Sequence, residues 1–157
     1  MTPVVIGASA TDARVTTLME AQQTELTGRY DDASLTEPFD PGSSSGAGNV
    51  LLTVQGDLGL IACGALKRWD AITAEIKRMY TLPEVRGQGH ARRGLVGLIE
   101  RGCAQGYSRL MLEWRPATAS QRSSPLMDGW ASPVSRTSAM TRAPTSACVS
   151  SWCCPPT

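Results

Sequence analysis

The stretch from Val85 to Arg93, which reads Val-Arg-Gly-Gln-Gly-His-Ala-Arg-Arg, is the part of the sequence best suited to hold a charged ligand. Gly87 and Gly89 allow a tight turn and a close approach of the backbone to a bound group. A helical pattern follows, and the unpaired N–H groups at a helix start favour an anion. Because three arginines add positive charge, the stretch predicts a cradle for a pyrophosphate group.

Two other phosphate-binding motifs do not fit this stretch. No Gly-Lys-Ser/Thr follows it, so it is not a Walker loop, and the third glycine of a dinucleotide fingerprint is missing. The residue types alone are equally consistent with a glycine-rich turn that precedes a capped helix. His90 is the single histidine of the chain and is expected to line the turn. We expect no metal site, because one histidine does not make a histidine-rich zinc cluster.

The elements that must position this stretch follow from the pattern of apolar residues. A hairpin is indicated around Gln55-Gly56-Asp57, and Thr11 or Asp12 can cap the first helix. The expected order is β-α-β-β-β-α-β, a mixed α/β sheet. The expected strands are 2–8, 49–54, 58–66, 71–80 and 109–113, and the expected helices end near residues 26 and 103. The expected helix core positions are Val15, Leu18, Met19, Gln22 and Leu26, then Leu95, Leu98 and Ile99.

Residues 74–92 resemble motif A of the GNAT superfamily of N-acetyltransferases. The pattern Arg/Gln-x-x-Gly-x-Gly/Ala is met by Arg86, Gly89 and Ala91, after a strand. The element order agrees with this family, and the resemblance covers about residues 3–114. It implies acetyl-CoA as the acetyl donor. It also implies cofactor contacts through the backbone of Met79, Tyr80 and Thr81, and of Arg86, Gly87, Gln88, Gly89, His90, Ala91 and Arg92.

The same resemblance implies a base for the attacking amine and an acid for the leaving thiolate. Glu75, on the central strand, is the expected base, acting directly or through a water molecule. The alternative is a strand carboxylate paired with Lys77 or Arg109. The family commonly uses a tyrosine after the fifth strand as the acid, and no tyrosine occurs there in this chain. Tyr80 and Tyr107 are better explained as packing residues.

The composition divides the chain in two. Residues 1–114 hold 13 of the 14 acidic residues and 11 of the 15 basic ones, whereas residues 115–157 hold one acid, four arginines and six of the ten prolines. The formal net charge of +1 gives no basic surface for nucleic acid. No apolar run approaches the ~20 residues of a membrane span, and no signal peptide is visible. We therefore expect a cytoplasmic protein without nucleic-acid or membrane partners.

The segment from about Trp114 onward does not resemble the second half of the family. Reading the codons one base out of register forces Gly-x-x-Gly from residues 127–131 and Val-Leu from residues 152–154, and it permits Glu-Thr-Gly after strand five. These fall where the family pattern requires them. Our hypothesis is that this segment is an out-of-frame translation, and the alternative is an unusual but genuine tail. The loss would leave strand five with an open edge and give an unstable product with weak activity.

The sequence thus predicts an incomplete acetyltransferase domain at 1–113 and an atypical tail at 114–157. The expected fold is α/β and GNAT-like, a mixed, mostly antiparallel sheet flanked by helices, with the C-terminal helix and strands missing or replaced. The expected activity is transfer of an acetyl group from acetyl-CoA to a primary amine of a small molecule or protein. A homodimer is compatible with it. The alternatives are an inactive acyl-CoA-binding remnant and a small interaction domain with a disordered tail.

Overall fold

The computed structural model describes residues 2–29, 46–57, 59–114, 141–142 and 148–153, and the side chains of these up to Leu112. These described residues form two long helices, one 3₁₀ turn and one sheet. The helices are α1 (Ala13–Arg29) and α2 (His90–Ala104), and the 3₁₀ turn is Pro83–Val85. The strands are β1 (Val4–Gly7), β2 (Val50–Gly56), β3 (Gly59–Arg68), β4 (Thr73–Thr81), β5 (Arg109–Trp114), β6 (Thr141–Arg142) and β7 (Cys148–Cys153).

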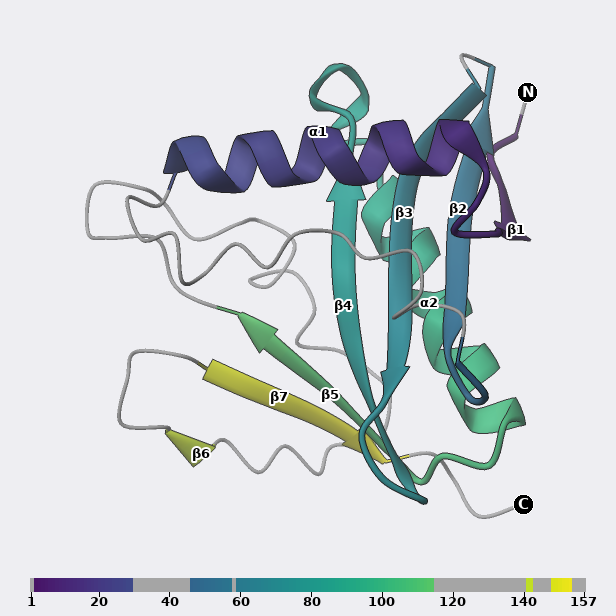
Figure 1. Ribbon diagram of the computed structural model, residues 1–157, viewed down its shortest axis with the longest axis vertical. Helices are drawn as coiled ribbons and strands as arrows, with labels where there is room; N and C mark the ends of the chain where they lie inside the picture. The colour runs from purple at the N-terminus through teal and green to yellow at the C-terminus, as the bar shows by residue number, and fades with distance from the viewer. Residues whose placement is uncertain (1, 30–45, 58, 115–140, 143–147, 154–157) are drawn as a thin grey trace.

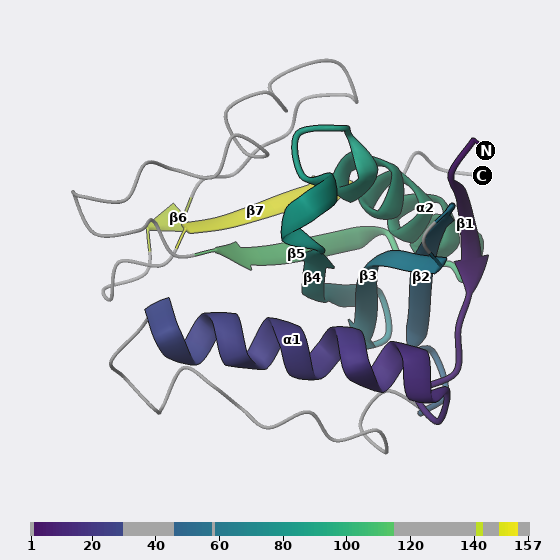
Figure 2. The same cartoon turned by 90° about the horizontal axis from the view of Figure 1, so that it is seen from above.

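The strands form one sheet in the order β1-β2-β3-β4-β5-β7-β6. Every neighbouring pair is antiparallel except β4 and β5, which run parallel because α2 crosses between them. Figure 1 shows α1 in front of the sheet and α2 behind it, and Figure 2 shows the same three layers from above. The expected mixed, mostly antiparallel sheet between helices is therefore confirmed.

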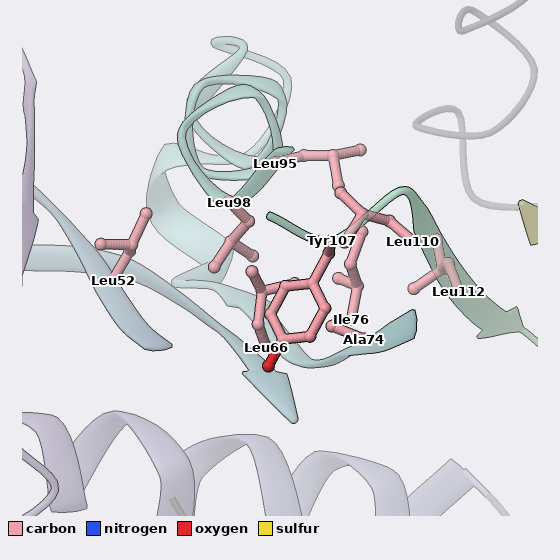
Figure 3. Close-up of a cluster of buried hydrophobic side chains, with 9 residues drawn as sticks. All are labelled: Leu52, Leu66, Ala74, Ile76, Leu95, Leu98, Tyr107, Leu110 and Leu112. Carbon is pink, nitrogen blue, oxygen red and sulfur yellow. The ribbon is translucent and has the colours of Figure 1, made fainter. Parts of the chain in front are cut away.

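Each helix packs an apolar stripe on its own face of the sheet. Figure 3 shows the α2 side, where Leu95 and Leu98 meet strand residues such as Ile76 and Leu110. On the other side, Val15, Leu18 and Met19 of α1 are buried against residues of β2 and β3. These are positions that the helical spacing predicts, because residues three and four apart share one helix face.

The ends of the elements follow local chemistry. Asp12 caps α1, since its carboxylate accepts the backbone N–H of Arg14 at 2.9 Å. After α2, Gly106 adopts φ 87°, a left-handed conformation that glycine adopts at little cost. The hairpin between β2 and β3 lies where Gln55-Gly56-Asp57 predicts it. Pro38, Pro41 and the run Gly42–Gly46 predict a loop at 30–49, of which residues 30–45 lie outside the described residues.

Part of the C-terminal segment joins the sheet. β7 pairs with β5 from Arg109↔Cys153 to Trp114↔Cys148, so β5 has strands on both sides. The expectation of an open edge at strand five is wrong in this respect, because the tail supplies a strand in that place. Residues 115–140, where a family helix would follow, lie outside the described residues. No helix within the described residues is long and apolar enough to cross a membrane.

Candidate active site

The two parallel strands at the centre of the sheet separate partway along their length. β4 pairs with β5 only from Thr73 to Ile76, although β4 itself continues to Thr81. Figure 1 shows the two strands diverging toward their C-terminal ends. From Lys77 onward, β4 therefore pairs with a strand on the β3 side alone. Its other side offers backbone hydrogen-bonding groups to a ligand, as a sheet edge does.

A bulge in β4 marks the start of this separation. Ala65 pairs with Lys77 but Cys63 pairs with Tyr80, so Arg78 and Met79 together face the single residue Gly64. Arg78 has φ 58°, which is rare for a residue with a side chain. One extra residue exchanges the two faces of a strand. Met79 consequently packs with the α2 side of the core and Tyr80 with the α1 side.

The backbone of β4 beyond the bulge alternates in direction. The N–H of Leu82 donates to Ile61 O on β3 at 3.0 Å, so the groups of Met79 and Thr81 point away from β3. Two side chains already occupy the carbonyls on that side. Gln22 Nε2 donates to Met79 O at 3.1 Å, and Arg86 Nε donates to Thr81 O at 3.0 Å. The N–H groups of Met79 and Thr81 remain as donors toward the side that β5 has left.

The predicted cradle follows directly at the end of β4. Gly87 and Gly89 have φ 78° and 81°, and Gly89 is the N-cap of α2. The first hydrogen bond of the helix runs from Arg93 N to Gly89 O. Within the part of the chain that the structure describes, the N–H groups from Gly87 to Ala91 donate to no backbone carbonyl. Such a row of donors at a helix start is an anion site.

His90 is the first residue of α2 and is buried, with 7% of its surface exposed. Its Nε2 lies 3.4 Å from Gln88 Oε1, and its Nδ1 has no hydrogen-bond partner among the described residues. His90 thus lines the turn, as the sequence predicts. Arg92 lies on another side of the helix and lines a hollow of about 840 Å³ between α2 and β1, together with Gln88, Gly89, Arg93 and Arg101.

Arg86 departs from the expected arrangement. Its backbone N–H donates to Pro83 O at 3.3 Å, so the row of unpaired donors begins one residue later, at Gly87. Its guanidinium forms an ion pair with Glu25 of α1 and lies 5.7 Å from the centre of the Tyr80 ring. The hydrogen bond that Arg86 donates to the Glu25 carboxylate raises the pKa of Arg86 above its usual value.

Glu75 lies on the α1 face of β4, two residues before the strands separate. It is 7% exposed, and its Oε2 lies 3.3 Å from Lys77 Nζ. Of the two ion-pair partners that the sequence suggests, the structure places Lys77 beside it. The expected base is therefore a buried carboxylate with a neighbouring ammonium group, on the face that α1 covers.

Tyr80, Tyr107 and Cys63 have packing environments. Burial, and then the charge of Glu25, raises the pKa of Tyr80 above its ordinary value. Tyr107 is 5% exposed, and its hydroxyl donates to Gly48 O at 2.9 Å. Burial raises the pKa of the Cys63 thiol to about 12, and its Sγ donates to Arg78 O at 3.6 Å. These contacts agree with packing roles for both tyrosines.

A comparison with protein-family models identifies the family of proteins to which this split sheet and anion cradle belong. The model of the acetyltransferase (GNAT) family matches residues 15–123. The chain belongs to the GNAT acetyltransferase family. The match contains the whole glycine-rich stretch and extends past Trp114, so it confirms the resemblance seen in residues 74–92. Among curated proteins, the comparison finds no relative.

Solved structures show the same fold. The PaiA N-acetyltransferase from Thermoplasma acidophilum, in complex with coenzyme A, has 17% identity and a TM-score of 0.69, covering 98% of this chain and 99% of that one. A GNAT acetyltransferase from Elizabethkingia anophelis with acetyl-CoA bound has 15% identity and a TM-score of 0.58, covering 97% and 98%. An aminoglycoside 6'-N-acetyltransferase complexed with coenzyme A has 11% identity and a TM-score of 0.57, covering 70% and 61%.

The site also contains residues that the sequence analysis did not assign to it. Gln22 appears in the sequence only as a core position of the first helix, and Glu25 does not appear at all, yet both contact β4 or the loop after it. Gln22 did carry a signal, since a polar residue within an apolar stripe needs a buried hydrogen-bond partner. No sequence pattern marks Glu25, because its ion-pair partner Arg86 is 61 positions away in the sequence.

Proposed function

We propose that this chain is an N-acetyltransferase that transfers the acetyl group of acetyl-CoA to a primary amine of a small molecule or protein. The observation that carries the proposal is the row of N–H groups from Gly87 to Ala91, which donate to no backbone carbonyl of the described residues and lie next to the stretch of β4 that β5 leaves. A pyrophosphate needs the first feature, and an extended amide-containing arm needs the second. Acetyl-CoA has both in one molecule.

In this proposal the donor lies along the end of β4. The pyrophosphate accepts hydrogen bonds from Gly87, Gln88, Gly89, His90 and Ala91, and Arg92 adds charge one residue later. The pantetheine arm takes the place of a neighbouring strand and meets the N–H groups of Met79 and Thr81. Tyr80, whose backbone the resemblance also implies as a contact, faces Cys63 on β3 with its backbone and packs its side chain on the α1 side.

The N–H of Met79 is the proposed donor to the thioester oxygen. An N–H fixed at that position stabilises the negative charge that develops as the amine attacks. The bulge and the hydrogen bond from Gln22 hold this part of the backbone in place before any ligand binds. Glu75 is the proposed base, which accepts a proton from the attacking ammonium group directly or through water. The acceptor approaches on the α1 face, where Glu75 lies.

The second candidate is a chain that binds acetyl-CoA without turnover. It is favoured by the absence of any tyrosine in residues 115–157, where the resemblance implies the general acid. It also fits the proposal that 114–157 is read out of frame. Sequencing the coding DNA tests that proposal. A stop codon in the alternate frame between Trp114 and Thr157, or the lack of a tyrosine and a Gly-Phe there, would contradict it.

Two measurements on the purified chain distinguish these candidates. Coenzyme A is expected to raise the melting temperature, because a ligand that binds only the folded state stabilises it. Release of free thiol from acetyl-CoA is then followed with a panel of amines. Stabilisation with turnover supports the enzyme, stabilisation without turnover supports the binding remnant, and no stabilisation contradicts both.

We also propose a cytoplasmic location, where acetyl-CoA is the ordinary donor.

A further inference from the structure

The side chain of Arg86 is directed toward α1 and the end of β4. Its Nε donates to Thr81 O at 3.0 Å, its Nη2 donates to Glu25 Oε2, and its guanidinium lies over the Tyr80 ring. Three kinds of contact thus fix one side chain: a backbone carbonyl, a carboxylate and an aromatic face. This is the geometry in which arginine differs most from lysine, because the planar guanidinium can donate in two directions and stack at once.

The helix that supplies Glu25 contacts the donor side of the molecule at further points. Gln22 Nε2 donates to Met79 O at 3.1 Å, and Gln23 Oε1 accepts from Arg78 Nη1 at 3.3 Å. Within four residues of α1, three side chains therefore hold the bulge of β4 and the start of the loop. Of these contacts, the Glu25–Arg86 pair alone reaches past the strand to the first residue of the glycine-rich stretch.

The charges of the pair offset each other before any ligand binds. The side chains of Arg86 and Glu25 are 39% and 25% exposed, so the pair is partly desolvated. Glu25 thereby compensates the positive charge of Arg86, and the N–H groups from Gly87 to Ala91 are the groups that bind the anion. The fixed Arg86 determines where that row begins, because its own N–H closes the 3₁₀ turn on Pro83.

We propose that Glu25 and Arg86 form a positioning pair that holds the cradle in its binding geometry from the opposite side of the sheet. The proposal rests on the proposed function, since it concerns binding of acetyl-CoA. Neither side chain touches the cofactor in this arrangement. Loss of the pair lets the loop between Thr81 and Gly87 move. The N–H groups from Gly87 to Ala91 then point less directly at the pyrophosphate, and coenzyme A binds more weakly. The chemical step, which uses groups on β4, keeps its rate once the donor is bound.

A double-mutant cycle on the full chain tests this pair. Glu25→Gln keeps the size of the side chain and removes its charge. Arg86→Lys keeps the charge and removes the planar guanidinium that donates in two directions. Each is expected to weaken coenzyme A binding about fivefold by calorimetry, as expected for a partly exposed charge pair. The double variant should lose little more than either single one. With acetyl-CoA as substrate, KM should rise by a similar factor at unchanged kcat.

Thr24→Val is the matched control, because Thr24 is exposed next to Glu25 and its hydroxyl, as far as the described residues go, donates only to Glu20 O of its own helix. It should leave coenzyme A binding unchanged. Melting temperatures verify that each variant is folded, and Arg86→Gln provides a further variant at the same site. Wild-type affinity in Glu25→Gln, or losses that add in the double variant, would overturn the pair. Absence of coenzyme A binding in the wild type would instead contradict the proposed function.

Discussion

Glu75 and Lys77 lie two residues apart on β4, and Lys77 Nζ sits 3.3 Å from Glu75 Oε2 on the face that α1 covers. The pair lies just where β5 stops pairing with β4. Under the proposed function, a carboxylate at that point lies close to where the incoming amine meets the thioester. The same contact would equally fix a carboxylate that serves the fold alone, so kinetics must separate the two roles.

Glu75→Gln is expected to lower kcat by about 10²-fold or more, because general-base catalysis contributes about 10²–10⁴-fold. The KM for acetyl-CoA should stay close to the wild-type value, since Glu75 lies away from the cradle. The free-thiol assay measures both constants. Glu20→Gln, an exposed carboxylate on α1, is the control and should change neither. A Glu75→Gln variant with kcat within twofold of the wild type would leave Glu75 as a structural ion-pair partner.

Gly89→Ala should weaken coenzyme A binding by about tenfold or more. Gly89 has φ 81°, a conformation that costs an alanine about 1–2 kcal/mol. Relief of that strain would turn the N–H groups away from the anion, and each such charged hydrogen bond contributes about 1.5–3 kcal/mol. Gly59→Ala is the matched control, since Gly59 has φ 96° in the β2–β3 hairpin and likewise has open space at its Cβ. It should lose stability without losing coenzyme A affinity.

Gly64→Ala should destabilise the fold by about 1–3 kcal/mol, the usual cost of overpacking a core. A Cβ at Gly64 would lie 2.5 Å from Met79 Sδ and 2.8 Å from Leu98 Cδ1. Denaturant unfolding measures the loss. Gly94→Ala offers the opposite case, because its Cβ would lie 3.7 Å from Val54 Cγ2, an ordinary contact, within a helix. That variant should gain about 0.5–1 kcal/mol. Equal effects of the two substitutions would refute the packing argument.

Cys63 gives the protein a pH dependence at alkaline pH. Burial raises the pKa of its thiol from 9.0 to about 12. The folded state therefore holds the proton that the unfolded state releases, and the stabilisation is complete below pH 9.0 and is lost as the pH rises toward 12. Across this window the free energy of unfolding should fall more steeply in the wild type than in Cys63→Ala. Identical slopes would contradict the burial of Cys63.

Much of the fold could be predicted from the sequence because it rests on local patterns. The stripe of Val15, Leu18 and Met19 indicates a helix with one buried face, and Gln55-Gly56-Asp57 indicates a hairpin. Gly87 and Gly89 indicate a tight turn before a helix. Each is a signal between residues a few positions apart, so it needs no knowledge of the rest of the chain.

The bulge at Arg78 was not foreseen, because one extra residue in a strand leaves the alternation of side chains almost unchanged in the sequence. It nevertheless decides that Tyr80 faces α1 and that Met79 faces α2. The pairing of β7 with β5 was missed for a different reason. Residues 148–153 carry no strong strand pattern, and their place is set by the edge that β5 offers.

The sequence by itself determined the family motif, the order of the elements up to Trp114, and the glycine-rich turn before α2, because all of these depend on neighbours along the chain. Only the tertiary structure decided that Arg86 turns away from the cradle to Glu25, that Glu75 pairs with Lys77 rather than Arg109, and that Gln22 holds Met79. The physical reason is that side-chain partners are chosen by distance in space. Which charged or polar groups meet is fixed only after α1 has packed on the sheet.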